Sequence, residues 1–297
     1  MPEGYTHVKT GTMALRSSQV KTGYLLAFGA GTQGPDPLFF VQVYKKKRVP
    51  DWHTFAGRMH REKTGEFLVH LLENALSPVE RAYAMGFLTH YATDSLMHPY
   101  VEFLTQSPGA PYGIASGHGY YEIALDSWGH QQDFGTPLVP RERSTPTPCI
   151  EELREIARLF SDCVYLTYQI HLPQKTVISA FKTMRFIRGA LVSRFGVRRA
   201  LFSLAESVMK LEPGYIQSHI TPAAPLRPMP AEWQNPFTGQ TYPGGARELL
   251  EQAVNLASDY LNAAGSYWDG TLSLQDCAAL LGSRSYESGL ESTDDTV

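Results

Sequence analysis

The sequence predicts an all-α fold, an irregular bundle of several helices. Apolar residues recur at helical spacing in many segments, as at Phe67, Leu71 and Ala75. No alternation of apolar and polar residues is long enough to indicate a strand. Hydrophobic residues make up 43% of the 297-residue chain, which is enough for one large core.

The first helix is expected over residues 12–29, because the run 24–28 is apolar and glycines follow it. Gly34-Pro35-Asp36-Pro37 predicts a tight turn, since prolines on both sides restrict the backbone around Asp36. A second helix is expected over residues 59–76, where the apolar period is 3.6.

A third helix is expected from residue 78 to about residue 98, and its start has a clear signal. Ser77 can cap the helix, Pro78 suits its first turn, and Glu80 completes a capping box. Pro99 is expected to end or kink this helix, because proline lacks a backbone N–H.

The later helices are predicted from their apolar periodicity and from the proline-rich segments between them. They are expected at residues 118–130, 151–171, 177–188, 198–210 and 246–268.

The third helix carries a stripe of side chains that can bind a metal. His90, Asp94 and His98 stand at i, i+4 and i+8, so they share one helix face. The two histidines lie about 12 Å apart along the axis, too far to meet on one ion. Asp94 has two oxygens and lies between them. The spacing therefore predicts a multinuclear metal site, of the kind that usually hydrolyses phosphate esters.

A second pair, His118 and Glu122, repeats the i, i+4 spacing on the next predicted helix. His90 and Asp94 alone would suit a hydrogen-bonded core pair equally well. Burying all five polar groups is costly unless they are paired or liganded, which favours metal binding. Imidazole and carboxylate are ligand types that suit Zn²⁺.

Composition narrows the class of protein. The net charge of −3 argues against a stable nucleic-acid partner, which usually requires a basic protein. Cys149, Cys163 and Cys277 are sparse and widely spaced, as expected of free thiols. The first residues lack the charged and apolar regions of a signal peptide, so the expected location is the cytoplasm, with secretion by another route left open.

The ordered motifs resemble the zinc-dependent phospholipase C family, whose all-helical fold is shared with fungal single-strand-specific nucleases. The resemblance covers residues 7 to about 126. The residues that carry it are Gly34-Pro35-Asp36-Pro37, His60, His90-x-x-x-Asp94, His98-Pro99 and His118-x-x-x-Glu122.

The resemblance implies a set of ligands and one catalytic residue. One zinc would be held by Asp36, His60, His90 and Asp94, and another by His98, His118 and Glu122. Asp94 would reach a third zinc together with His7. Asp36 would also orient or deprotonate the attacking water. His53 competes with His60 for its role, and His60 is favoured because it fits the family order and is expected to open a helix.

The resemblance implies zinc as the cofactor, with two ions expected and a third left open. Secreted members ligate the third metal through an N-terminal Trp, which this chain does not have. The expected activity is hydrolysis of a phosphodiester, most simply a phospholipid head-group linkage. The alternatives are a nuclease-like phosphodiesterase, which would need an aromatic slot, and a non-catalytic scaffold stabilised by metal.

Basic residues gather in the second half of the chain. They could contact anionic lipid head groups at a membrane surface, although pairing with internal acids is the favoured interpretation. The residues concerned are Lys182, Arg185, Arg188, Arg194, Arg198 and Arg199.

The chain is expected to divide at its proline-rich segments. The ranges are a ligand-bearing helical region at 1–130, a proline-rich connection at 131–147, the helical remainder of the same domain at 148–282, and a polar, disordered tail at 283–297.

Overall fold

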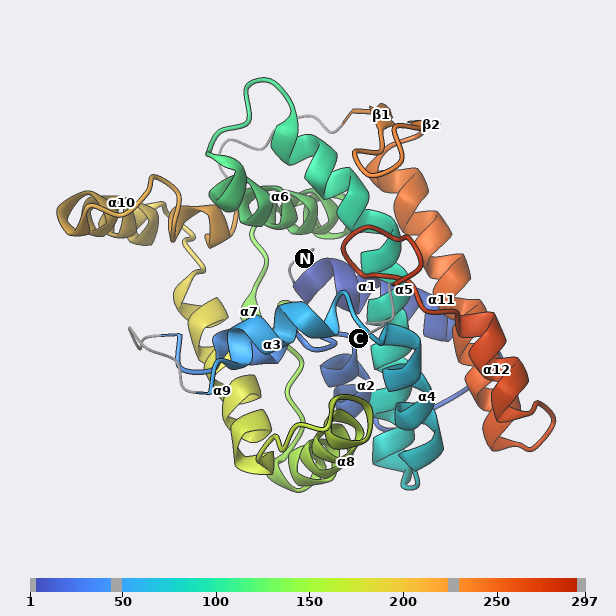
Figure 1. The fold of residues 1–297 in the computed structure, drawn as a ribbon. Coiled ribbons are helices and arrows are strands. Elements are labelled where there is room, and N and C mark those ends of the chain that lie inside the picture. Colours follow the sequence, from blue (N-terminus) through green and yellow to red (C-terminus); the bar gives the residue numbers. More distant parts are fainter. Residues whose placement is uncertain (1–3, 44–49, 224–229, 293–297) are drawn as a thin grey trace.

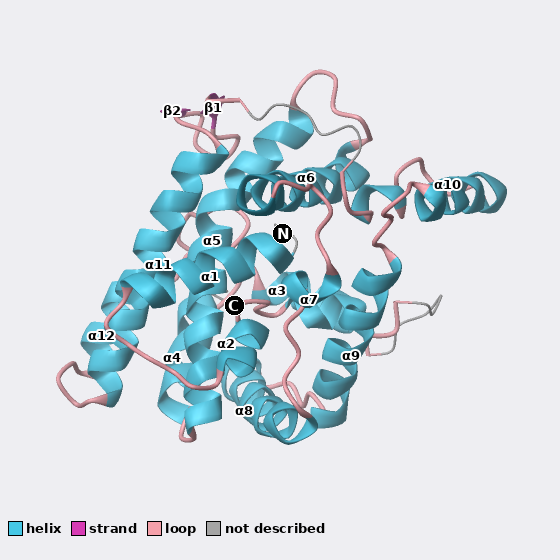
Figure 2. Ribbon diagram, turned by 180° about the vertical axis from the view of Figure 1, so that it is seen from behind, coloured by secondary structure: helices cyan, strands magenta, loops and turns pink. Residues whose placement is uncertain are grey.

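The computed structural model describes residues 4–43, 50–223 and 230–292. These ranges form a bundle of α-helices with two short 3₁₀ helices and one small sheet, which confirms the predicted all-α class (Figures 1 and 2). The α-helices are α1 (Gly4–Ser17), α2 (Leu25–Gly31), α3 (Trp52–Met59), α4 (Thr64–Asn74), α5 (Pro78–Gln106), α6 (Ile114–Phe134), α7 (Arg141–Ser144), α8 (Ile150–Tyr168), α9 (Gln174–Ala190), α10 (Val197–Met209), α11 (Ala246–Trp268) and α12 (Leu274–Leu281).

The remaining elements are short. The 3₁₀ helices are η1 (Asp36–Phe40) and η2 (Gln217–His219). Strands β1 (Glu232–Gln234) and β2 (Thr241–Pro243) pair antiparallel, with Trp233 opposite Tyr242. The sequence pattern did not reveal this hairpin, because three-residue strands are too short to show alternation.

Helix α5 is the central element and is buried along most of its length. Its start has the predicted capping box: Ser77 accepts from the Glu80 backbone N–H, and Glu80 accepts from that of Ser77. Helices α2 and α11 pack along α5, and α1, α6 and α8 also contact it (Figure 1). Any polar side chain in the middle of α5 is therefore enclosed by other helices.

Pro99 lies inside α5 and does not end it, since the helix runs on to Gln106, while the alternative of a kink stays a prediction. Proline cannot donate to the carbonyl four residues earlier, which is that of Ser95. The C-terminal segment packs at this point, where a side chain on Gly289 would overlap the Ser95 carbonyl oxygen. The C-terminal segment therefore packs closely against α5 at the point where the helical hydrogen bond is missing.

Two of the predicted N-terminal helices are each divided in two. The range 12–29 holds the end of α1 and most of α2, separated by a polar stretch with serine and glycine. The range 59–76 holds the end of α3 and all of α4, because Lys63 takes a left-handed conformation. His60 therefore follows α3 as its C-cap and does not open a helix as expected.

The predicted tail is structured as far as residue 292, which corrects the expectation of disorder from residue 283. Tyr286 is only 1% exposed, and its backbone N–H donates to the His60 carbonyl oxygen at 2.7 Å. Its ring packs edge-on against His60 and His90. The burial of Tyr286 therefore keeps this segment structured although the residues around it are polar. Residues 293–297 lie outside the described residues.

The proline-rich connection after α6 holds the short helix α7. Val139 and Thr145 are buried in it, so the segment packs against the bundle. The division of the chain at 131–147 stays a prediction. Among the helices of the described ranges, none has the length and apolar character needed to cross a bilayer.

Helices α2 and α5 touch through two glycines. A Cβ on Gly86 would overlap the Phe28 carbonyl oxygen and approach Gly31 Cα. We expect Gly86→Ala to lower the free energy of unfolding by about 1–3 kcal/mol, because the helices would have to move apart. Urea unfolding measures this change.

Gly57→Ala is the matched control. It is also a helical glycine, but a Cβ there would meet nothing closer than the Arg61 guanidinium at 3.5 Å. It should be neutral or stabilising by up to about 1 kcal/mol. Equal effects of the two substitutions would contradict the close helix contact.

Candidate metal centre

The stripe on α5 faces one buried site. His90 and Asp94 are 0% exposed and His98 is 3% exposed. His90 Nε2 lies 2.9 Å from Asp94 Oδ2, and His98 Nε2 lies 3.8 Å from Asp94 Oδ1. The two oxygens of Asp94 thus point toward different histidines, as the i, i+4, i+8 spacing predicts.

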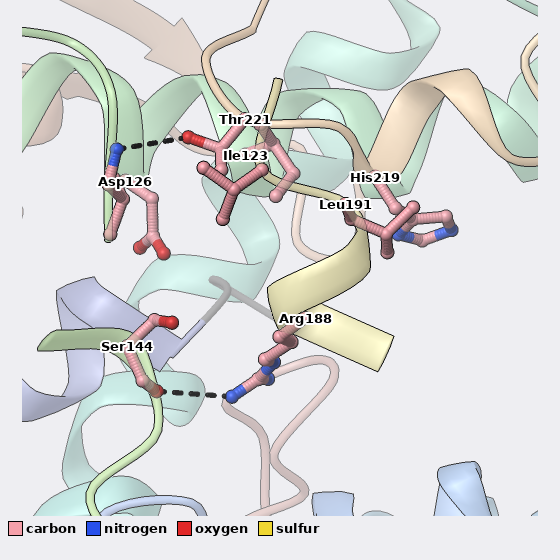
Figure 3. Close-up of a pocket in the computed structure, with 9 residues that line it drawn as sticks. Ile123, Asp126, Ser144, Arg188, Leu191, His219 and Thr221 are labelled. Atoms are coloured by element: carbon pink, nitrogen blue, oxygen red, sulfur yellow. Dashed lines mark hydrogen bonds between the residues drawn. The ribbon is translucent and has the colours of Figure 1, made fainter. Parts of the chain in front are cut away.

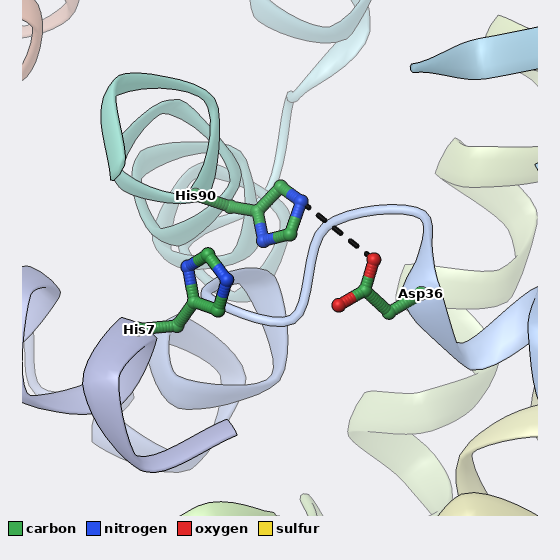
Figure 4. A group of neighbouring side chains, drawn as sticks. All are labelled: His7, Asp36 and His90. Carbon is green, nitrogen blue, oxygen red and sulfur yellow. Dashed lines mark ion pairs between the residues drawn. The ribbon is translucent and has the colours of Figure 1, made fainter. Parts of the chain in front are cut away.

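The turn before η1 brings Asp36 to this site. Gly34 has φ +51°, and a Cβ there would overlap the His90 ring, so only glycine leaves room for the imidazole. Asp36 Oδ1 lies 3.8 Å from His90 Nε2 (Figure 4). It lies 3.3 Å from His60 Nε2. The structure therefore places His60 at the site, whereas His53 is exposed and packs edge-on against Phe39.

His7 reaches the site from α1 and is 0% exposed. Its ring stacks on that of His90 with centroids 4.3 Å apart (Figure 4). Its Nε2 lies 3.2 Å from Asp94 Oδ1. Asp94 is thus shared between His7 on one side and the His60–His90 pair on the other.

A second group forms between α5 and α6. His118 Nε2 lies 2.8 Å from Glu122 Oε1, and His98 Nε2 lies 3.9 Å from the same oxygen. The His118 side chain is 34% exposed, in contrast to the buried groups around Asp94. The centre therefore reaches the protein surface at His118.

Glu102 belongs to this region although sequence reasoning did not select it. Its Oε2 lies 3.5 Å from His118 Nδ1. That contact is the leading cause of a lowered pKa for the Glu102 carboxyl. The signal was present, because Glu102 continues the stripe at i+12 from His90.

Backbone carbonyls orient three of the imidazoles. The Nδ1 atoms of His60, His90 and His98 lie 2.7, 3.2 and 2.8 Å from the carbonyl oxygens of Ala56, Thr32 and Tyr286. A ring nitrogen that faces a carbonyl must carry the proton, so Nε2 is the nitrogen that offers its lone pair toward the centre. Such partners are typical of metal-binding histidines.

The metal-facing nitrogen and oxygen atoms of the centre are arranged to bind an ion and do not satisfy one another by hydrogen bonds. Nε2 of His90 and His98 and both oxygens of Asp36 and Asp94 are buried without a hydrogen-bond partner among the described residues. That arrangement is costly unless an ion binds there. Bonds of about 2.1 Å in a tetrahedral zinc site place ligand atoms roughly 3.4 Å apart. The separations of 2.9–3.8 Å around Asp94 bracket that value.

Comparison with known proteins agrees with this geometry. A family model described as zinc dependent phospholipase C matches residues 6–175. The chain belongs to the zinc-dependent phospholipase C family. No curated protein and no solved structure matches the chain. The matched range runs from α1 to the start of α9 and contains every predicted ligand, while α10 to α12 lie beyond it.

Among the residues of this family member that the structure describes, three sets of side chains could each hold an ion, because the ligand atoms within each set lie within 4.8 Å of one another. They are His7 with Asp36 and His90, His60 with His90 and Asp94, and His98 with His118 and Glu122. The first two sets share His90, so they form one continuous region around Asp94. The structure thus brings together all eight predicted ligands.

Burial sets the charge state of the histidines. It lowers the pKa of His7 and His118 and holds that of His98 well below its usual range. At neutral pH these rings are therefore uncharged, which is the form that binds metal. Burial also opposes charge on His90, but the carboxylates of Asp94 and Asp36 outweigh it and raise its pKa.

Asp94 stays ionised because the neighbouring histidines outweigh the effect of burial on its carboxyl. Burial alone would raise the pKa of its carboxyl, but His90, His98 and His7 together hold it well below the usual range. The centre therefore offers an ionised carboxylate among imidazoles, of which those of His7, His98 and His118 are uncharged, a donor set suited to Zn²⁺.

Asp126 of α6 fixes the start of α1 and with it His7. Its carboxylate accepts from the backbone N–H groups of Tyr5 and Thr6 at 2.9 and 2.7 Å and from the Thr6 hydroxyl at 2.6 Å. A carboxylate at a helix N-terminus is stabilising. A small cavity lies beside it, lined also by Ile123 and by Arg188, which donates to the Ser144 carbonyl oxygen (Figure 3).

We expect Asp94→Asn to lower zinc affinity by about 100-fold or more, because losing a shared ligand should cost at least as much as losing an outer partner. Elemental analysis after dialysis gives the zinc content. His171→Ala is the control, since His171 is exposed and stacks on Tyr165. An Asp94→Asn protein with wild-type zinc content would contradict the role of this carboxylate.

We expect Asp126→Asn to lower the free energy of unfolding by about 1–3 kcal/mol, because charge-assisted hydrogen bonds to the start of α1 are weakened. Asp133→Asn is the control on the same helix pair. Asp133 contacts Tyr5 and Lys9 at a partly exposed position, where ion pairs contribute about 0–1 kcal/mol. Urea unfolding that ranks Asp133→Asn as the more damaging change would refute this role of Asp126.

Proposed function

We propose that the protein is a zinc-dependent phosphodiesterase that hydrolyses the head-group linkage of phospholipids. The observation that carries the proposal is the position of Asp94, whose two oxygens face two groups of histidines in a centre that opens at His118. Family membership supports the same chemistry.

The proposed ligands are the eight residues already described. Asp36, His60, His90 and Asp94 would hold one zinc, His98, His118 and Glu122 another, and His7 with Asp94 a third. Zinc in such a centre polarises a phosphoryl oxygen and lowers the pKa of water at the site.

Asp36 is the proposed catalytic residue. Both of its oxygens are buried and lack hydrogen-bond partners in the part of the chain that the structure describes. Asp36 can therefore accept a proton from the attacking water and orient it toward phosphorus. As the water oxygen bonds to phosphorus, the phosphorus–oxygen bond to the glycerol breaks. The leaving alkoxide takes up the proton that Asp36 accepted, which releases a diacylglycerol and a phosphomonoester and restores the Asp36 carboxylate.

The aromatic residues favour a phospholipase over a nuclease. Five tyrosines near the ligands in the sequence could form a slot for bases, and four of them, Tyr91, Tyr100, Tyr120 and Tyr121, are at most 5% exposed. Tyr91 is fixed in the core, where its hydroxyl donates to the Leu281 carbonyl oxygen. These rings therefore fill the core, and only Tyr112 of the five is partly exposed.

A non-catalytic scaffold would close its metal shell against solvent. The 34% exposure of His118 supports an open edge. Elemental analysis, followed by assays on phosphatidylcholine, single-stranded DNA and a small chromogenic phosphodiester, separates the three functions.

We expect the zinc-loaded protein to hydrolyse phosphatidylcholine and the small ester, and Asp36→Asn to lower kcat by about 10²–10⁴-fold on both. His53→Ala is the control, because this neighbouring histidine lies outside the centre. Hydrolysis of DNA alone would favour the nuclease, and a zinc-loaded protein inactive on all three substrates would favour the scaffold.

A further inference from the structure

Helix α10 projects from the bundle (Figures 1 and 2) and carries an exposed apolar stripe. Val197, Leu201, Leu204 and Val208 stand at i, i+4, i+7 and i+11, so they share one face. Each is 61–73% exposed, and Phe195 just before the helix is 81% exposed. A surface helix normally packs such a stripe against the core, and no described element covers this one.

The opposite face of α10 holds its one carboxylate. Glu206 is 2% exposed and accepts from the backbone N–H groups of Gly214, Ile216 and Gln217. These hydrogen bonds, with one from the Gln217 side chain, hold its pKa below the ordinary value although burial would raise it. The helix is therefore inverted relative to an ordinary surface helix, with its apolar residues outside and its acid inside.

Two arginines fix this orientation. Arg198 donates to the carbonyl oxygens of Gly189 and Val192 at the end of α9, at 2.8 and 3.1 Å. Arg199 donates to that of Ile220 at 2.9 Å. These arginines bind carbonyl groups and not the internal acids expected from the sequence. These hydrogen bonds therefore fix the orientation of α10 and keep its apolar stripe exposed.

Basic residues predominate around the stripe, with Glu212 exposed two residues after Lys210. Residues 174–210 contain eight lysines and arginines and a single glutamate, the inward-facing Glu206, although the whole chain carries −3. Arg194 and Lys210 are exposed at the two ends of the stripe, and Lys182 is exposed on α9. Apolar residues bordered by cations complement a membrane surface that contains anionic lipid.

The stripe is also joined to the open edge of the metal centre. Helix α10 packs on η2, and η2 packs on α6, which carries His118. Gly119, next to His118, lies so close to His219 of η2 that a Cβ would overlap its ring. A surface that held α10 would therefore lie near the helix at which the centre opens.

We propose that Phe195 and the outward face of α10 form a membrane-binding surface, which inserts its apolar side chains into a lipid layer that contains anionic head groups. This inference rests on the proposed function, because it brings the centre to its lipid substrate. Pairing of two copies through the stripe is disfavoured, because Arg194 and Lys210 would meet cations of the other copy in either orientation.

Vesicle binding tests this surface. The probe is vesicles made of equal parts phosphatidylcholine and phosphatidylglycerol, and the variant is L201S/L204S. Both leucines are more than 60% exposed, so the fold should be retained. Binding by co-sedimentation should weaken about tenfold per leucine. Added salt should weaken binding of the wild type to these vesicles.

L76S/L280S is the matched control. Leu76 and Leu280 are 72% and 61% exposed and lie away from α10, so binding should stay at the wild-type level. A wild-type protein that does not bind the vesicles would overturn the proposal, as would equal losses in the two variants. So would a dimer that L201S/L204S dissociates without any change in vesicle binding.

A soluble substrate separates this proposal from the proposed function. L201S/L204S should turn over the small chromogenic phosphodiester at the wild-type rate and lose activity on vesicles. If the zinc-loaded wild type hydrolyses neither substrate, the proposed function fails. Vesicle binding of the wild type and the two variants then tests the membrane-binding surface independently of the proposed activity.

Discussion

The carboxylate of Asp94 is the constraint on which the rest of this structure depends. It lies on the most enclosed helix of the bundle, ionised and 0% exposed. His7 and His90 contact its two oxygens at 3.2 and 2.9 Å. A buried charge must be balanced by neighbours or by a metal. The packing of α1 and α6 against α5, and the turn at Gly34 that brings Asp36 to His90, place those neighbours within reach.

Segments far apart in the chain orient the ligands through backbone carbonyls. Thr32 follows α2, Ala56 lies in α3 and Tyr286 follows α12, yet each holds one imidazole of the centre. The Gly31–Gly86 contact sets the distance of α2 from α5, and so the place of Thr32. The centre is therefore preorganised by helix packing, as expected of a functional site carried on rigid elements.

The proposed metal centre and the proposed membrane surface are connected through packed elements of the fold. The centre is buried around Asp94 and open at His118 on α6. Helix α10 reaches that helix through η2 and turns its apolar residues outward. An enzyme that cuts a lipid head group must hold its centre next to a lipid layer. A fixed, cationic and apolar helix beside the opening would meet that requirement without a separate domain.

The sequence by itself determined the helical class, the stripe on α5 and the His118–Glu122 pair, because spacing along one helix decides which side chains share a face. The resemblance added Asp36, His60 and His7, but only the tertiary structure could bring them within reach of Asp94. The tertiary structure also determined that α5 continues past Pro99, that Tyr286 is buried, and that α10 turns its apolar residues outward. Those depend on carbonyl groups and packing partners distant in sequence, such as the residues around Gly214 that bind Glu206. Local periodicity carries no information about such partners.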